Sequence, residues 1–135
     1  MHSITKTIDF CYGHRLLNYD GQCKHLHGHN GRIEIHVESN SLDEKGMVID
    51  FTVIKETVKT WIDSNMDHRM ILSKDDPLIP ILKDAGQPIY VMDSNPTAEN
   101  IAKLVFNQVK SQGIDVKEIR LWETPTSYSS YSDIT

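Results

Sequence analysis

The segment HGHNGRIEIHVES, residues 27–39, decides the fold because it alternates apolar and polar side chains. A period of two is typical of a half-buried β-strand, whose successive side chains point to opposite faces of a sheet. The apolar face is made of Ile33, Ile35 and Val37. Counting back by twos places His29 and His27 on that face, provided that Gly31 does not hold a bulge. The sequence therefore predicts a strand that begins with two histidines on its core face.

A second alternating segment, KTIDFCYGH at residues 6–14, precedes this strand. One of its faces carries Ile8, Phe10, Tyr12 and His14. If the two strands pair antiparallel across the loop between them, His14 lies opposite His27 and His29. Catalytic zinc often takes three protein nitrogens and keeps a fourth position open for water or substrate. An isolated His-x-His is weak evidence, but three histidines on one face predict a metal site.

The remaining segments predict helices and further strands. Apolar residues at three- and four-residue spacing predict helices over residues 51–65 and 95–113. Strands are expected at 47–50, 89–93 and 116–124, and a proline-interrupted loop at 73–88. This order predicts one α+β domain over residues 1–135, an antiparallel β-sheet with two helices packed on one face. The exposed edges of such a sheet are compatible with a homo-oligomer.

Length and charge exclude several classes of protein. The chain has 135 residues, a formal charge of −5, and no apolar run long enough to span a membrane. The start of the chain shows no signal peptide, so a cytoplasmic location with free cysteines is expected. The acidic balance argues against nucleic-acid binding. Basic residues near the histidines are compatible with a small anionic ligand and equally with ordinary surface charge: Arg15, Lys24, Arg32 and Arg69.

Cys23 has two interpretations that its spacing does not separate. It could be a fourth metal ligand, which would make the site closed and structural. It could instead be a reactive thiol, made acidic by Lys24, His25 and a bound cation. Cys11 is interpreted as a small inert residue, and the ring of His25 is given no ligand role.

Three more side chains suggest chemistry. Asp67 precedes His68 just after the first predicted helix, where a carboxylate can fix the tautomer of the ring, although such pairs are often plain surface. Glu123 ends the core-directed face of the strand at 116–124. A carboxylate there needs a partner, either an arginine or a ligand that presents two adjacent N–H groups.

In combination these elements resemble the 6-pyruvoyltetrahydropterin synthase / 6-carboxytetrahydropterin synthase family. The matching elements are FCYGHRL (10–16), CKHLHGH (23–29), GMVIDF (46–51), MDHRMIL (66–72), NPTAEN (95–100) and LWET (121–124). They run nearly end to end, and their combination is more specific than any one of them. One departure is CYGH, in which Tyr12 and Gly13 stand where the family often has two alanines.

The resemblance implies a role for each site residue. Zinc is held by His14, His27 and His29, and Cys23 is the catalytic thiolate. Asp67 and His68 act with Cys23 in proton transfer. Glu123 anchors the pterin ring with help from Thr97 and Glu99. The implied assembly is the tunnelling fold, a homohexamer of two stacked trimers with active sites between subunits.

The implied activity is that of a zinc-dependent carbon-carbon / carbon-oxygen lyase. The favoured reaction converts 7,8-dihydroneopterin triphosphate to 6-carboxy-5,6,7,8-tetrahydropterin, with release of triphosphate and acetaldehyde, in queuosine (7-deazaguanine) biosynthesis. One alternative is 6-pyruvoyltetrahydropterin synthase, which eliminates triphosphate without side-chain cleavage. An alternative from another class is a non-catalytic module that zinc only staples together. Arg15, Lys24 and Arg69 are the residues considered for holding the triphosphate.

Overall fold

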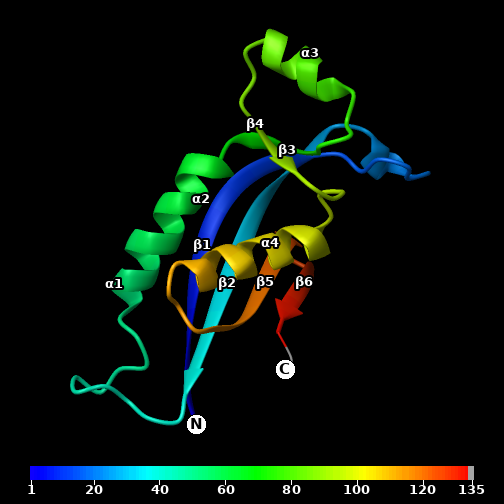
Figure 1. Cartoon of the computed structure of the whole chain (residues 1–135). Helices are drawn as coiled ribbons and strands as arrows, with labels where there is room; N and C mark the ends of the chain where they lie inside the picture. Colours follow the sequence, from blue (N-terminus) through cyan, green and yellow to red (C-terminus); the bar gives the residue numbers. More distant parts are fainter. Residues whose placement is uncertain (134–135) are drawn as a thin grey trace.

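The structure, a computed structural model, describes residues 1–133 and shows an α+β fold built on one curled sheet (Figure 1). The strands are β1 (His2–His14), β2 (His27–Ser39), β3 (Arg69–Ser73), β4 (Ile89–Met92), β5 (Val116–Thr124) and β6 (Ser127–Ser132). The helical elements are η1 (Gln22–Lys24), α1 (Phe51–Ile54), η2 (Lys55–Lys59), α2 (Thr60–Asn65), α3 (Leu78–Asp84) and α4 (Ala98–Ser111). The strand order across the sheet is β4-β3-β1-β2-β5-β6.

The hairpin of β1 and β2 forms the centre of the sheet, as the alternation predicts. The two strands pair antiparallel over their full length, from His2 opposite Ser39 to His14 opposite His27. The pairing shows no break at Gly31, so the parity argument holds and both predicted strands are confirmed. The long register puts the metal-ligand candidates at one end of the hairpin.

The sheet is mixed, so the expectation of an antiparallel sheet is wrong. β3 pairs parallel with β1, and β4 pairs parallel with β3. The cause is the helical segment 51–65, which carries the chain back along the sheet before β3 begins. Parallel neighbours need such a crossover, whereas antiparallel neighbours need only a short turn.

The expected helix count is also wrong, because α3 lies inside the predicted loop at 73–88. Its prolines, Pro77 and Pro80, occupy the cap and first turn, where a missing N–H costs little. Residues 47–50 form no strand and bend at 48 and 49, and Asp50 caps α1 by accepting from the N–H of Thr52. β6 was not expected, because its sequence SYSSYS has no apolar face of aliphatic residues.

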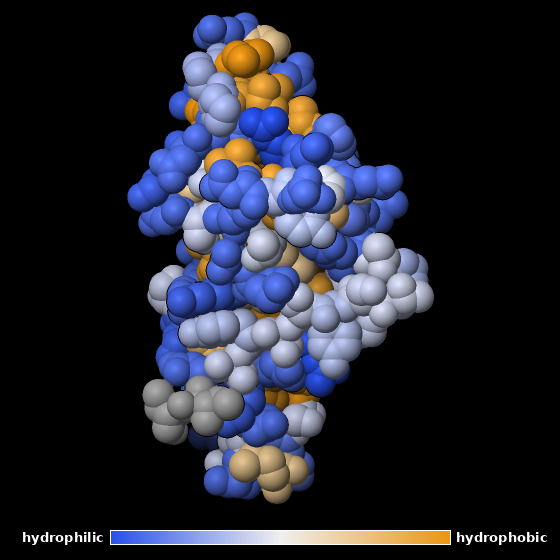
Figure 2. Space-filling view, turned by 90° about the vertical axis from the view of Figure 1, so that its right-hand side faces the viewer, coloured by the Kyte–Doolittle hydropathy of each residue, from blue (hydrophilic) through white to orange (hydrophobic). Residues whose placement is uncertain are grey.

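Two helical segments cover one face of the sheet and bury the core against it (Figure 1). The segment α1–η2–α2 is one continuous helix with a π turn in its middle, and it packs beside α4. The core residues include Ile8, Phe10, Ile33, Ile35, Ile119 and Leu121 from strands, and Ile54, Val58, Ile62, Ile101, Val105 and Val109 from helices. α3 buries none of its residues, and Figure 2 shows apolar side chains gathered at its end of the molecule.

Ile35 tests the central role of the hairpin in stability. Its side chain is fully buried where β2 pairs with both β1 and β5. We expect Ile35→Ala to lower the free energy of unfolding by about 2–5 kcal/mol, because the surrounding strands cannot collapse into the cavity. Urea denaturation measures this change. Val53→Ala on the exposed side of α1 is the control, with an expected change below about 0.5 kcal/mol.

Candidate functional site

The three predicted metal ligands come together at the end of the central hairpin. His14 ends β1, while His27 and His29 begin β2 on the same face. Their ligand nitrogens all lie within 4.8 Å of one another. We call these three residues the histidine cluster. The parity argument therefore predicted the arrangement correctly.

Backbone carbonyls orient two rings of the histidine cluster. His14 donates its Nδ1–H to the carbonyl oxygen of Pro96 at 2.7 Å, and His27 donates its Nδ1–H to the carbonyl of His25 at 2.8 Å. Such bonds fix the tautomer that leaves Nε2 free with a lone pair. Pro96 was not identified from the sequence, and His25 acts through its carbonyl and not through its ring.

The histidine cluster fits a divalent metal ion. The Nε2 atoms of His14 and His29 are buried and have no hydrogen-bond partner within residues 1–133. Burial lowers the pKa of His14 to about 4, against the opposing effect of the Pro96 carbonyl and with the help of the neighbouring histidines. His14 is therefore neutral at pH 7, the form in which imidazole binds metals.

Cys23 lies beside the histidine cluster but outside its ligand group. It sits on η1 and lines a cavity of about 340 Å³ together with His14, His27 and Glu123, which we call the Cys23 cavity. Its sulfur is not among the atoms that lie within 4.8 Å of one another. This arrangement favours a thiol that faces a ligand over a fourth metal ligand.

The loop that carries Cys23 is tied down at two points. The N–H of Leu16 donates to the carbonyl of Cys23 at 2.9 Å, which closes the loop on itself. The side chain of Asn95 accepts from the N–H of Leu17 and donates to its carbonyl. Asn95 precedes α4, so one amide joins the Cys23 loop to the start of that helix. The sequence alone gave no sign of this role.

Glu123 faces both the histidine cluster and the Cys23 cavity. Its Oε2 lies 3.6 Å from Nε2 of His29, and its side chain is 28% exposed. No arginine within residues 1–133 forms an ion pair with it, so the arginine interpretation finds no support. The carboxylate is open to a ligand in the cavity.

Thr97 and Glu99 line the same cavity but are also held by structural contacts. The Thr97 hydroxyl caps α4 by accepting from the N–H of Asn100 at 3.1 Å. Glu99 accepts a hydrogen bond from the Ser129 hydroxyl at 3.0 Å. A substitution at either residue would therefore change the fold locally as well as the cavity.

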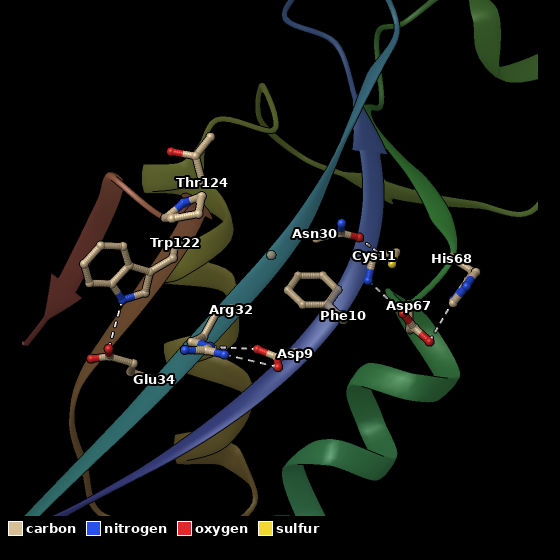
Figure 3. Close-up of a pocket in the computed structure, with 12 residues that line it drawn as sticks. Asp9, Phe10, Cys11, Asn30, Arg32, Glu34, Asp67, His68, Trp122 and Thr124 are labelled. Atoms are coloured by element: carbon tan, nitrogen blue, oxygen red, sulfur yellow. Dashed lines mark hydrogen bonds and ion pairs between the residues drawn. The ribbon is translucent and has the colours of Figure 1, made fainter.

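Asp67 and His68 do not line the Cys23 cavity. They line a different cavity, of about 660 Å³, which we call the His68 cavity (Figure 3). Asp67 accepts from the backbone N–H of Cys11 at 2.9 Å and pairs with Nδ1 of His68 at 2.9 Å. Burial would raise the pKa of Asp67, but these two contacts outweigh it and lower the pKa. The ionised carboxylate thus orients a His68 ring that is 77% exposed.

Of the basic residues near the site, Arg15 already has a carboxylate partner within the chain. Its guanidinium forms a two-point ion pair with Asp76, whose side chain is completely buried. Arg69 donates to the carbonyl of Ser64 at 2.9 Å. Lys24 lies near the loop of Cys23 and is exposed. Asp76 was not identified from the sequence, and the structure shows that it is the buried partner of Arg15.

Asp76 is expected to make stability depend on pH below its ordinary pKa of 3.8. Burial would raise its pKa, but the hydrogen bonds from Arg15 and from the N–H of Leu78 outweigh burial and lower it. The stabilisation is present above pH 3.8 and is lost as the pH falls through the lowered value. We expect Asp76→Asn to cost about 2 kcal/mol or more at pH 7 and to reduce this acid-dependent loss. Urea denaturation across pH measures both, and equal acid dependence of the two proteins would contradict the assignment.

Known proteins resemble the chain over almost its whole length. The model of the family described as 6-pyruvoyl tetrahydropterin synthase matches residues 3–133. A curated 6-carboxy-5,6,7,8-tetrahydropterin synthase from Rickettsia conorii is 42% identical over 135 residues, covering 95% of this chain and 98% of the relative. The enzyme of that name from Haemophilus influenzae is 33% identical, covering 98% of this chain and 100% of the relative.

Solved structures share the fold. An uncharacterized protein from Wolinella succinogenes aligns with a TM-score of 0.81 at 29% identity, over 98% of both chains. The 6-pyruvoyl tetrahydropterin synthase of Caenorhabditis elegans aligns with a TM-score of 0.74 at 21% identity, covering 98% of this chain and 96% of that one.

Proposed function

The chain belongs to the 6-pyruvoyl tetrahydropterin synthase family, and from this premise we propose that it is a 6-carboxy-5,6,7,8-tetrahydropterin synthase. Relatives that carry this name match the chain from end to end at up to 42% identity. The proposed reaction converts 7,8-dihydroneopterin triphosphate to 6-carboxytetrahydropterin, triphosphate and acetaldehyde, as a lyase of queuosine biosynthesis in the cytoplasm.

The observation that carries the proposal is the histidine cluster beside a cavity that Cys23 and Glu123 both line. His14, His27 and His29 would hold the metal, which we propose to be zinc because three imidazoles and an open position suit it. When bound, zinc supplies a Lewis acid that stabilises negative charge on a substrate oxygen.

No helix within the described residues is both long and apolar enough to cross a membrane.

Glu123 is the proposed anchor for the pterin ring. A carboxylate accepts two adjacent N–H groups in parallel, and the pyrimidine edge of a pterin presents such a pair. Glu123 stands 3.6 Å from His29, so a ring bound there would direct its side chain toward the histidine cluster and Cys23. The proposed role of Cys23, as thiolate, is to remove a carbon-bound proton from that side chain.

The Asp67–His68 pair supports a site shared between subunits. Cys23 and this pair line different cavities of one chain, and His68 is largely exposed. Proton transfer between them needs hydrogen-bond reach, and no hydrogen bond joins them within the described residues of one chain. We propose that the pair of one subunit completes the Cys23 cavity of its neighbour in a homohexamer. The outer edges of β4 and β6 have no strand partner within the described residues and would be available for such contacts.

Acetaldehyde release tests the choice of product. We expect the zinc-loaded protein to release triphosphate and acetaldehyde from 7,8-dihydroneopterin triphosphate in equal amounts. A coupled alcohol dehydrogenase assay measures the acetaldehyde, and phosphate analysis measures the triphosphate. Triphosphate without acetaldehyde would support the 6-pyruvoyltetrahydropterin synthase alternative instead.

Cys23→Ala separates the enzyme from a zinc-stapled module. We expect this variant to remain folded and to keep one zinc per chain, because Cys23 lies outside the ligand group. Its turnover should fall by about 10²–10⁴, the usual contribution of general acid–base catalysis. Circular dichroism, zinc analysis and the acetaldehyde assay measure the three properties. Loss of zinc or of folding would favour the structural module.

A further inference from the structure

Tyr12 is a buried polar residue that the proposed function leaves without a role. It lies on β1 opposite His29, and only 3% of the residue is exposed. Its hydroxyl has no hydrogen-bond partner within residues 1–133. A buried hydroxyl without a partner costs about 1–3 kcal/mol, so its presence needs an explanation.

The ring of Tyr12 occupies the space of a missing side chain. Gly31 on β2 has no Cβ, and a Cβ added there would lie 2.8 Å from Cε1 of Tyr12. Such a contact is too close for a rigid ring, so Gly31 is required for this placement of Tyr12. Phe10 stacks on the ring of Tyr12, with ring centroids 5.0 Å apart and planes at 16°. The ring therefore has little freedom to turn away.

The register of the sheet places Glu123 on the far side of Gly31. β2 and β5 pair with Ile33 opposite Leu121, and continuing that antiparallel register by two residues puts Gly31 beside Glu123. The Tyr12 ring leans from β1 across Gly31, which directs its hydroxyl toward β5. Glu123 lines the Cys23 cavity and Tyr12 does not, so Tyr12 would act on a ligand there through Glu123.

The hydrogen-bonding groups of the two residues are complementary. A phenol ordinarily loses its proton only at a pH of about 10, so Tyr12 carries its proton at neutral pH. A protonated phenol can donate one hydrogen bond, and a carboxylate only accepts. In this structure the carboxylate of Glu123 is turned to His29 at 3.6 Å. That distance is too long for a hydrogen bond, so the carboxylate is free to accept one from the phenol.

We propose that Tyr12 is a positioning residue whose hydroxyl donates to the carboxylate of Glu123 and holds it in the orientation that receives the pterin. Gly31 makes this possible by leaving room for the ring between β1 and β5. This inference rests on the proposed function, because it assigns Glu123 to pterin binding. The contact would satisfy the buried hydroxyl through one lone pair of a carboxylate oxygen, and a lone pair on each of the two oxygens stays free for the paired N–H groups of the ligand.

Tyr12→Phe tests the proposal because it removes only the hydroxyl and keeps the ring over Gly31. The probe is 7,8-dihydroneopterin, titrated into the zinc-loaded protein by calorimetry. We expect Tyr12→Phe to weaken probe binding about tenfold, the effect of losing a hydrogen bond to a charged group. Zinc content should stay at one per chain, and KM for the triphosphate substrate should rise more than kcat falls. Tyr128→Phe on exposed β6 is the control and should bind as the wild type does.

A double-mutant cycle with Glu123→Gln shows whether the hydroxyl acts through Glu123. We expect Tyr12→Phe to have little further effect once Glu123 is replaced, because the two residues act as one unit. Full additivity of the two effects would overturn the role of Tyr12. If Glu123→Gln itself leaves probe binding unchanged, the assignment of Glu123 to pterin binding is wrong, and the proposed function is contradicted before the role of Tyr12 is tested.

The stability of the apoprotein gives an independent test. Tyr12→Phe should be as stable as the wild type or more stable, because the substitution removes a buried hydroxyl that has no partner. Clear destabilisation would show that the hydroxyl has a purely structural role.

Discussion

Replacing His27 by alanine is expected to abolish stoichiometric zinc binding and to lower turnover by about a thousandfold or more. His27 contributes one of three nitrogens within 4.8 Å, and two remaining imidazoles form a much weaker site. Lewis-acid stabilisation is worth several kcal/mol, and each 1.36 kcal/mol is a factor of ten in rate. Zinc analysis after gel filtration and the acetaldehyde assay measure the two losses.

His25→Ala is the matched control for this experiment. His25 lies two residues before His27 and is exposed. It contacts the histidine cluster only through its carbonyl oxygen, which alanine retains, so the bond to Nδ1 of His27 survives. We expect normal zinc content and normal turnover. If His27→Ala keeps its zinc, or if His25→Ala loses it, the assignment of the three ligands is wrong.

The histidine cluster could be predicted from sequence because strand geometry is local and strict. A one-residue slip would move every side chain of β2 to the other face, so the apolar residues Ile33, Ile35 and Val37 fix the face of the histidines. The antiparallel pairing then follows from a hairpin of two alternating segments. The same reasoning placed Glu123 at the end of the core face of β5, where the structure has it facing His29.

Other features depend on contacts that no local pattern reveals. The parallel pairing of β3 with β1 follows from the path of the helix between β2 and β3, and not from the five residues of β3 themselves. The short helix α3 has no fully buried residue and carries Pro80 in its first turn, so its segment resembles a proline-interrupted loop. Asp76 is identifiable only once the fold brings it to Arg15, sixty-one residues earlier in the chain. The Tyr12–Gly31 fit likewise needs the register of β1 and β2.

Mixed oligomers are expected to recover activity that each parent variant lacks. Cys23→Ala leaves an intact Asp67–His68 pair, and His68→Ala leaves an intact Cys23. If an active site takes Cys23 from one chain and His68 from its neighbour, random co-assembly at equal amounts restores about a quarter of the sites. The two variants carry different affinity tags, are co-expressed and are purified through both tags, and the acetaldehyde assay then measures turnover per site.

The physical reason for the recovery is the separation of the two groups within one chain. Cys23 and the Asp67–His68 pair line different cavities of one chain, and no hydrogen bond joins them within residues 1–133. Co-expression of Cys23→Ala with a Cys23→Ala/His68→Ala double variant is the control, since no chain then supplies the thiol and no activity should return. Native mass spectrometry confirms that both tags share one oligomer. Mixed oligomers that stay inactive would show that His68 does not serve a neighbour's Cys23, and that the site works within a single chain or without His68.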